Sequence, residues 1–161
     1  RVIKPQPPVY WYETPYLIEA TGYFCFHGHD GWGYKKPRYQ VGEVVYIKEA
    51  FYSESGDIWY KSDGQIAPMP IKWCSPLFMP EWAARYFIKI TDVRAERLQE
   101  ITESDAEAEG LNPADCTDNN YLDYPAVKMF ATLWDSINPK YSWASNPWVF
   151  RYSFVRVGNR C

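Results

Sequence analysis

The sequence predicts an α+β protein in which several short β-strands are accompanied by two short helices. Apolar and polar residues alternate over residues 86–95, and aromatic residues alternate with other residues over 148–155. An alternation of period two is typical of half-buried strands. Residues 126–137 instead repeat their apolar side chains at helical spacing. Because strands and helices do not alternate regularly, we expect a curled sheet or a small barrel.

The first 40 residues are dense in proline, tyrosine and glycine, which excludes long helices. One short strand pair fits around Val9–Tyr12 and Tyr23–Phe26. The glycine-rich run from His27 to Gly33 is expected to form an exposed loop tip.

A buried strand is predicted next, over Val44–Ile47. A second strand at Phe51–Tyr52 is expected to pair with Ile58–Tyr60 through a turn at residues 55–57, and residues 62–64 read as another tight turn. Residues 65–82 contain four prolines. We therefore expect an ordered loop there, and we expect aromatic residues to anchor it to the core.

Residues 79–110 form the central unit of the prediction, a long strand followed by a short acidic helix. The strand changes its apolar parity near Asp92, where a bulge or bend would re-aim it. Thr102 stands three residues before Asp105, the spacing of a capped helix start; Ser104 and Glu107 repeat that spacing. In addition, Asp105 and Glu109 would share one helical face, and two like charges at that spacing repel each other.

The C-terminal third contains one more helix and one more strand. After a polar loop over 112–124, a helix is predicted with Asp123 as a possible N-cap and Pro125 in its first turn. It ends at Asn138-Pro139, and its apolar stripe is expected to pack on the sheet. In the final strand, one face should carry the aromatic side chains of Trp148, Phe150, Tyr152 and Phe154, and the other face Val149, Arg151, Ser153 and Val155.

The bulk composition fits one domain without a membrane span. The chain has 161 residues, 47% of them hydrophobic, and no run approaches the length of about 20 apolar residues that a membrane helix needs. A formal net charge of −3 disfavours non-specific electrostatic binding of nucleic acid. Aromatic residues reach 19%, including 8 Trp and 14 Tyr, and a surplus of this kind can supply stacking platforms.

Cysteine usage indicates a reducing, cytoplasmic environment. The four cysteines are widely spaced and form no CxxC pair, so we expect them to be reduced. No secretory signal is present. The sequence opens with Arg1, and no initiator Met precedes it.

The run Cys25-x-His27-x-His29 has two interpretations. Cys and His are good zinc ligands, but no fourth ligand is spaced nearby, so a glycine-rich loop tip is the alternative that we favour over a metal site. No cofactor is expected. Both histidines of the chain lie in this run, which disfavours a histidine-based catalyst.

The aromatic cluster of Trp73, Phe78 and Trp82 stands beside two cations, Lys72 and Arg85. Indole faces next to cations are what base stacking and phosphate contact need. The alternative is a proline-rich loop that its aromatic residues pin to the core, with Arg85 bridging carboxylates.

Glu109 presents a similar choice. It belongs either to a solvated acidic helix or to a cleft where a carboxylate transfers protons or binds an exocyclic amine.

Five runs carry a resemblance to a known family. They are WCSPLFMPEWAAR (73–85), ITDVRAERLQEI (90–101), DAEAEG (105–110), LWDSIN (133–138) and SWASNPWV (142–149). Together they resemble the ASCH-domain proteins of bacteriophages and prophages, over nearly the whole chain except an insertion at about 10–36. The resemblance implies one domain over residues 1–161. It also implies a PUA-like β-barrel with helices at a cleft, a superfamily associated with RNA or modified nucleosides.

The resemblance also implies a candidate enzymatic chemistry. Small bacterial relatives are amidohydrolases that deacetylate N4-acetylcytidine, using a Gly-x-Lys-x-x-Thr-x-Arg motif and a glutamate on a short helix. The glutamate matches Glu109 and the last Arg of the motif matches Arg1. The Lys and Thr would therefore lie before the first residue given, and without them this chemistry is not expected of the chain.

Three functions follow as hypotheses. The first is a domain that binds RNA or a modified nucleoside, located in the cytoplasm of a bacterial host. Its predicted ligand-binding residues are Arg1, Lys72, Trp73, Trp82 and Arg85. The second is an amidohydrolase with Glu109 as its catalytic residue. The third is a phage protein-interaction module without a small ligand. The oligomeric state stays open.

Overall fold

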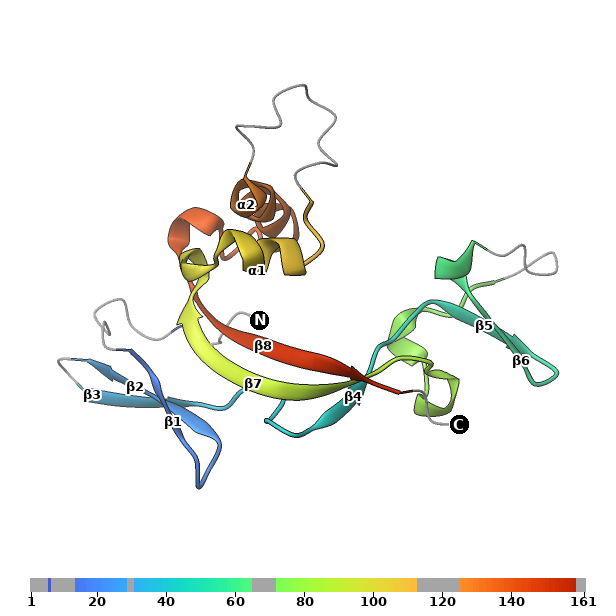
Figure 1. The fold of residues 1–161 in the computed structure, drawn as a ribbon, viewed down its shortest axis with the longest axis horizontal. Helices are drawn as coiled ribbons and strands as arrows, with labels where there is room; N and C mark the ends of the chain where they lie inside the picture. The colour runs from blue at the N-terminus through green and yellow to red at the C-terminus, as the bar shows by residue number, and fades with distance from the viewer. Residues whose placement is uncertain (1–5, 7–13, 29–30, 65–71, 113–124, 159–161) are drawn as a thin grey trace. The chain divides into compact units, whose positions relative to one another are not determined.

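The computed structural model describes residues 6, 14–28, 31–64, 72–112 and 125–158 (Figure 1). Its strands and α-helices are, in chain order, β1 (Tyr16–Ile18), β2 (Tyr23–Gly28), β3 (Gly31–Lys35), β4 (Val44–Tyr46), β5 (Phe51–Glu54), β6 (Asp57–Tyr60), β7 (Phe87–Arg97), α1 (Glu103–Ala108), α2 (Ala126–Ile137) and β8 (Trp148–Val157). Single 3₁₀ turns lie at Lys61–Asp63, Pro76–Phe78, Glu81–Ala83, Leu98–Glu100 and Trp143–Ser145.

The fold class is α+β, as predicted. The strands form three small sheets with the orders β1-β2-β3, β4-β7-β8 and β5-β6. Within the described part of the chain, none of these sheets closes into a barrel. The PUA-like barrel therefore stays a prediction.

The chain divides into two compact units. The first unit contains residues 1–38 and 93–151, and the second contains residues 39–92 and 152–161. β7 and β8 each contribute residues to both units. The prediction of one domain with an insertion is not decided by this division, and each unit is described by itself.

Aromatic packing between β2 and β8 forms the core of the first unit. Phe24 and Phe26 are buried. The ring of Phe24 lies 5.4 Å from that of Phe150, and the ring of Phe26 meets Trp148 edge-on at 5.2 Å. Edge-on and tilted pairs of this kind add to the hydrophobic gain of burying the rings. One face of the β1-β2-β3 sheet is thereby fixed against β8.

β2 and β3 extend into the run that the sequence analysis assigned to a loop. Gly28 pairs with Gly31, and His27 pairs with Trp32. The prediction of a loop over His27–Gly33 is therefore wrong for these residues, while residues 29–30 lie outside the described part. The physical reason is the alternation of aromatic residues with glycine in β3, because aromatic side chains favour strands.

The neighbour of β2 on its other side is β1, with Tyr16 opposite Cys25 and Ile18 opposite Tyr23. The strand predicted at Val9–Tyr12 lies outside the described residues.

The acidic helix α1 begins as predicted, with Thr102 as its N-cap. The Thr102 hydroxyl accepts a hydrogen bond from the Asp105 backbone N–H, and the Asp105 carboxylate accepts one from the Thr102 backbone N–H, both at 3.2 Å. This is a capping box, which satisfies two amides that a helix start leaves open. A second contact, from Arg151 Nη2 to Asp105 Oδ1 at 2.9 Å, ties the helix to β8.

Helix α2 is present where predicted, but its packing differs. Its N-cap is Pro125, two residues later than the predicted N-cap, so Pro125 precedes the first turn instead of lying in it; the helix ends before Asn138, as predicted. α2 lies against α1 and the Trp143–Ser145 turn, and Leu133 is exposed. The prediction that the whole apolar stripe packs on the sheet is wrong, because part of α2 covers these neighbours instead.

In the second unit, β4 is an edge strand that pairs with β7. Val44 is exposed, so the predicted strand exists but is not the buried strand that was expected. The β5–β6 hairpin is confirmed. Its turn residues Ser55 and Gly56 have positive φ of 53° and 94°, as a two-residue hairpin turn requires.

The proline-rich segment contacts the core through different residues than predicted. Met79 and Ala83 are buried and pack with Phe51, whereas Phe78 and Trp82 are 75% and 68% exposed. The prediction that Phe78 and Trp82 anchor this loop is wrong. Met79 follows the Pro76–Phe78 turn and Ala83 ends the Glu81–Ala83 turn, so each turn contributes one buried side chain next to its exposed aromatic residue.

The two long strands are confirmed, with corrections to their faces. The buried residues of β7 are Phe87, Ile90, Val93 and Ala95. The parity of burial therefore changes between Ile90 and Val93, at the predicted place, and also between Phe87 and Ile90, where no change was predicted. In β8, Trp148 and Phe150 are buried, but Phe154 is 56% exposed. Phe154 lies in the C-terminal half of β8, the outer strand of its sheet, where burial decreases along the strand.

Candidate functional site

An open hollow of about 380 Å³ lies in the second unit, at the Glu81–Ala83 turn. Among the described residues, Glu81, Trp82, Ala84 and Phe87 line it. Phe87 is buried and Trp82 is largely exposed. A volume of this size is at the small end of ligand sites, which begin at roughly 300 Å³.

The ring of Trp82 is available to a ligand because its neighbours hold the turn in place. Ala83 is fully buried, and its backbone carbonyl accepts a hydrogen bond of 2.8 Å from the Tyr60 hydroxyl. The turn is thus fixed on the core by the residue after Trp82. An exposed indole on a fixed turn is a suitable stacking surface for a base or a sugar.

Glu81 is a lining residue that the sequence analysis did not select. It lines the same hollow as Trp82, and carboxylates accept hydrogen bonds from exocyclic amines such as the N4 amine of cytosine. The signal was present in the sequence, since Glu81 lies between Pro80 and Trp82 in the run that carries the resemblance.

Arg85 does not line the hollow among the described residues, and its guanidinium is engaged elsewhere. Nε and Nη2 donate to the Glu49 carboxylate, both at 2.9 Å. Nη1 and Nη2 donate to the Asp63 carboxylate at 2.9 and 2.6 Å. The ring of Tyr60 lies under the guanidinium carbon at 4.0 Å. Arg85 therefore forms two bidentate pairs, the strong geometry for Arg and carboxylate.

The interactions in this network shift the pKa values of its residues. Hydrogen bonds from Arg85 hold the pKa of Glu49 below its usual range, and those to Glu49 and Asp63 raise the pKa of Arg85. Burial raises the pKa of the Tyr60 hydroxyl. The alternative in which Arg85 bridges carboxylates is thus the one that the geometry favours, and its role as a ligand contact stays a prediction.

Lys72 and Trp73 lie beside β5, away from the hollow lining. The adjacent Cys74 forms a backbone bridge with Phe51, with a hydrogen bond of 2.8 Å from the Cys74 N–H. Lys72 is exposed and Trp73 is half-buried. Of the predicted ligand-binding residues that the structure describes, Trp82 alone lines this hollow.

Glu109 lies in the first unit, immediately after the last residue of α1. It is the C-cap and is exposed. The Glu109 backbone N–H donates to the Asp105 carbonyl at 3.1 Å, so Glu109 still lies one helical turn after Asp105, as expected, although α1 ends at Ala108. Arg1 lies outside the described residues, so the catalytic role of Glu109 and the part of Arg1 stay predictions.

The candidate metal site is only partly described. Cys25 is buried, the ring of His27 stacks on Trp32 with centroids 4.1 Å apart, and His29 lies outside the described residues. In the described ranges, no group of three or more His, Cys, Asp or Glu side chains is placed to hold a metal ion. The same ranges contain no helix with the length and apolar character that crossing a membrane requires.

Comparison with known proteins gives no relative. No family model matches the chain, and neither a curated protein nor a solved structure matches it.

Proposed function

We propose that this chain binds a modified nucleoside or RNA through the hollow at Trp82. The observation that carries the proposal is the exposed indole of Trp82 on a hollow that Glu81 also lines. Stacking on Trp82 would hold a base, and Glu81 would accept a hydrogen bond from its exocyclic amine. The resemblance to ASCH-domain proteins supports the same ligand class. It also supports a PUA-like domain of phage or prophage origin that acts in the cytoplasm of a bacterial host.

Cytidine and N4-acetylcytidine are suitable probes, because they differ in the amine that Glu81 would contact. We expect cytidine to bind saturably. Line broadening of the nucleoside protons in NMR spectra measures this binding. Trp82→Ala should weaken it by about 1–3 kcal/mol, whereas Phe78→Ala should leave it unchanged, since Phe78 is equally exposed but does not line the hollow. Equal affinity of the wild type and Trp82→Ala would remove the hollow as the site.

A protein-interaction module is the second candidate, and one observation favours it. Leu77, Phe78 and Trp82 are 72%, 75% and 68% exposed within six residues of chain. Exposed apolar clusters of this kind mark protein contacts as well as ligand sites. If the folded wild-type chain binds neither cytidine nor N4-acetylcytidine in the titration, this candidate is favoured over the first.

A further inference from the structure

A second aromatic surface lies on the β1-β2-β3 sheet of the first unit. Cross-strand partners in a sheet share a face, so Tyr16, Cys25 and Tyr34 lie on one side, together with the pair of His27 and Trp32. Tyr23 belongs to the same side, two residues before Cys25. We define the aromatic face as Tyr16, Tyr23, His27, Trp32 and Tyr34.

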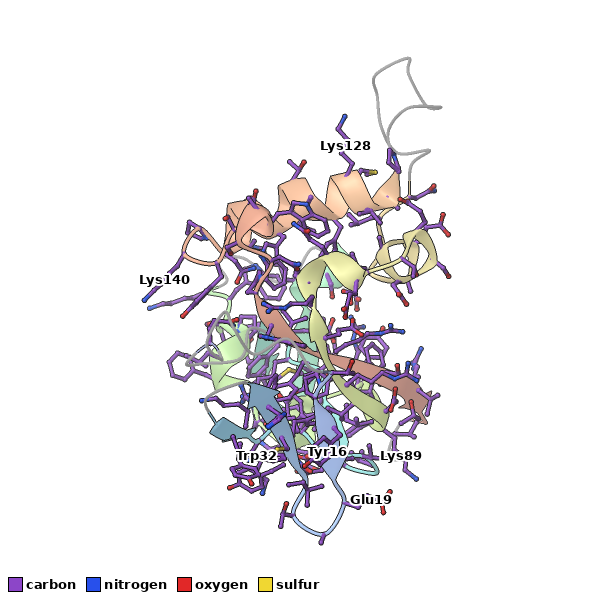
Figure 2. All side chains as sticks on the ribbon, turned by 90° about the vertical axis from the view of Figure 1, so that its left-hand side faces the viewer. Tyr16, Glu19, Trp32, Lys89, Lys128 and Lys140 are labelled. Atoms are coloured by element: carbon purple, nitrogen blue, oxygen red, sulfur yellow. The ribbon has the colours of Figure 1, made fainter. Side chains whose placement is uncertain are left out.

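The aromatic face is exposed, in contrast to the opposite side of the same sheet. Tyr16, Trp32 and Tyr34 are 52%, 57% and 56% exposed. The opposite side buries Phe24 and Phe26 against β8. Figure 2 labels Tyr16 on β1 and Trp32 on β3, with Glu19 at the turn between β1 and β2. An exposed face of large rings costs solvation free energy and often marks a binding site.

The positively charged side chain of Lys36 lies next to the aromatic face. Lys36 follows Tyr34 by two residues, and its Nζ lies 5.6 Å from the centre of the Tyr23 ring. Among the described residues, neither Lys35 nor Lys36 forms an ion pair with a carboxylate. The face therefore combines flat rings with a positive charge that an anion can reach.

We propose that the aromatic face binds single-stranded nucleic acid. Trp32 and Tyr34 lie two residues apart on β3, so they are about 7 Å apart, twice the rise per residue. The His27 ring supports that of Trp32 at 4.1 Å, so Trp32 and Tyr34 can each take a separate unstacked base. The ammonium of Lys36 contacts a phosphate of the same strand. A duplex is not the ligand, since its base faces are stacked on each other and cannot reach the rings. A neutral sugar would not use the cation.

The proposal is independent of the hollow at Trp82, and the test separates the two. Fluorescein-labelled 12-nucleotide oligouridylate and oligodeoxythymidylate are titrated with the full chain and followed by fluorescence anisotropy. We expect at least one probe to bind, and the comparison of the two identifies RNA or DNA as the preferred ligand. Trp32→Ala should weaken binding roughly 5- to 100-fold, the loss of one stacked base. Lys36→Gln should reduce the slope of log affinity against log salt by about 0.7, the value for one phosphate contact on a single strand.

Phe154→Ala is the matched control, because Phe154 is as exposed as Trp32 but lies on β8. Trp32→Leu, which keeps apolar area but has no ring, should weaken binding like Trp32→Ala and guards against a folding defect. The proposal is overturned if neither probe binds, or if Trp32→Ala and Phe154→Ala bind equally well. Oligonucleotide binding that depends on Trp82 and not on Trp32 would also overturn it, and would leave the hollow as the nucleic-acid site.

Discussion

Arg85 joins three segments of the second unit through one guanidinium. Its carboxylate partners Glu49 and Asp63 lie 36 and 22 positions away in the sequence, and the ring of Tyr86 lies 4.8 Å from the guanidinium carbon. Because the side chains of Arg85, Glu49 and Asp63 are mostly shielded from water, the ion pairs are screened less than surface pairs.

We therefore predict that Arg85→Lys lowers the free energy of unfolding by about 1–3 kcal/mol, since a lysine cannot form two bidentate pairs. Arg156→Lys is the control, because Arg156 also lies over Tyr86, at 4.6 Å, but is exposed. It should cost less than about 0.5 kcal/mol. Urea unfolding of the two variants checks this, and equal losses would contradict the structural role of Arg85.

The carboxyl of Glu96 has a raised pKa, whereas the pKa of Glu49 beside Arg85 is lowered. Burial raises the pKa of its carboxyl, more than the Arg151 guanidinium at 3.8 Å lowers it. A carboxyl whose folded pKa is raised contributes stability below its unfolded pKa and loses it as the pH rises through the folded pKa. At neutral pH the ionised Glu96 therefore destabilises the fold.

We predict that Glu96→Gln is more stable than the wild type at pH 7, and that the difference disappears below about pH 4, where both side chains are neutral. Thermal unfolding at the two pH values measures it. Glu107→Gln, on the exposed side of α1, serves as the control and should show no such pH-dependent gain. A lower stability of Glu96→Gln at pH 7 would mean that the contact with Arg151 outweighs burial.

Residue types alone could not separate the roles of Trp82 and Arg85. Both were predicted as ligand contacts from the sequence, because an indole beside a cation suits a nucleic-acid base and its phosphate. The structure leaves Trp82 on a hollow but surrounds Arg85 with Glu49 and Asp63. Long-range pairing of this kind depends on tertiary structure, so the sequence did not indicate which cation was already neutralised.

At the level of elements, α1 is a short helix that depends on its cap. A helix of six residues is too short to be stable by itself. Its first turn is held by the reciprocal hydrogen bonds between Thr102 and Asp105. Hydrogen bonds from Thr102, the largest cause, also lower the pKa of Asp105, so this stabilisation is lost as the pH falls through the folded pKa.

We predict that Thr102→Ala lowers the free energy of unfolding by about 1 kcal/mol, whereas Ser104→Ala changes it by less than about 0.5 kcal/mol. The comparison is informative because both residues had the sequence spacing of a cap, and the structure assigns the cap to Thr102. Chemical denaturation measures both variants. A larger loss from Ser104→Ala would place the helix start two residues later.

Elements with a regular period were predicted well, and those without one were not. β7, β8 and α2 repeat their apolar residues over ten or more positions, so the period identified them from sequence. β3 was missed because Gly31 and Gly33 carry no side chain, so that only Trp32 and Tyr34 reveal the strand. The aromatic face follows from the pairing of β3 with β2, and therefore could not be predicted once β3 was taken as a loop.

At the scale of the whole molecule, neither unit is made of one continuous stretch of chain. The second unit needs residues 152–161 as well as 39–92, and the first unit needs 1–38 as well as 93–151. The boundaries fall inside strands, after Asp92 in β7 and after Arg151 in β8. If one half of such a strand unfolds, the hydrogen bonds of the other half lose the adjacent hydrogen bonds that support them. The stabilities of the two units are therefore coupled.

We therefore predict one cooperative unfolding transition for the full chain, with coincident curves from tryptophan fluorescence and far-UV circular dichroism. The variants described above make the test specific, because Arg85 belongs to the second unit and Thr102 to the first. Arg85→Lys and Thr102→Ala should each shift the same single transition to lower urea concentration. Units that unfold separately would instead give two transitions, with each variant shifting only the transition of its own unit, and strands β7 and β8 would then not transmit stability across the boundaries at Asp92 and Arg151.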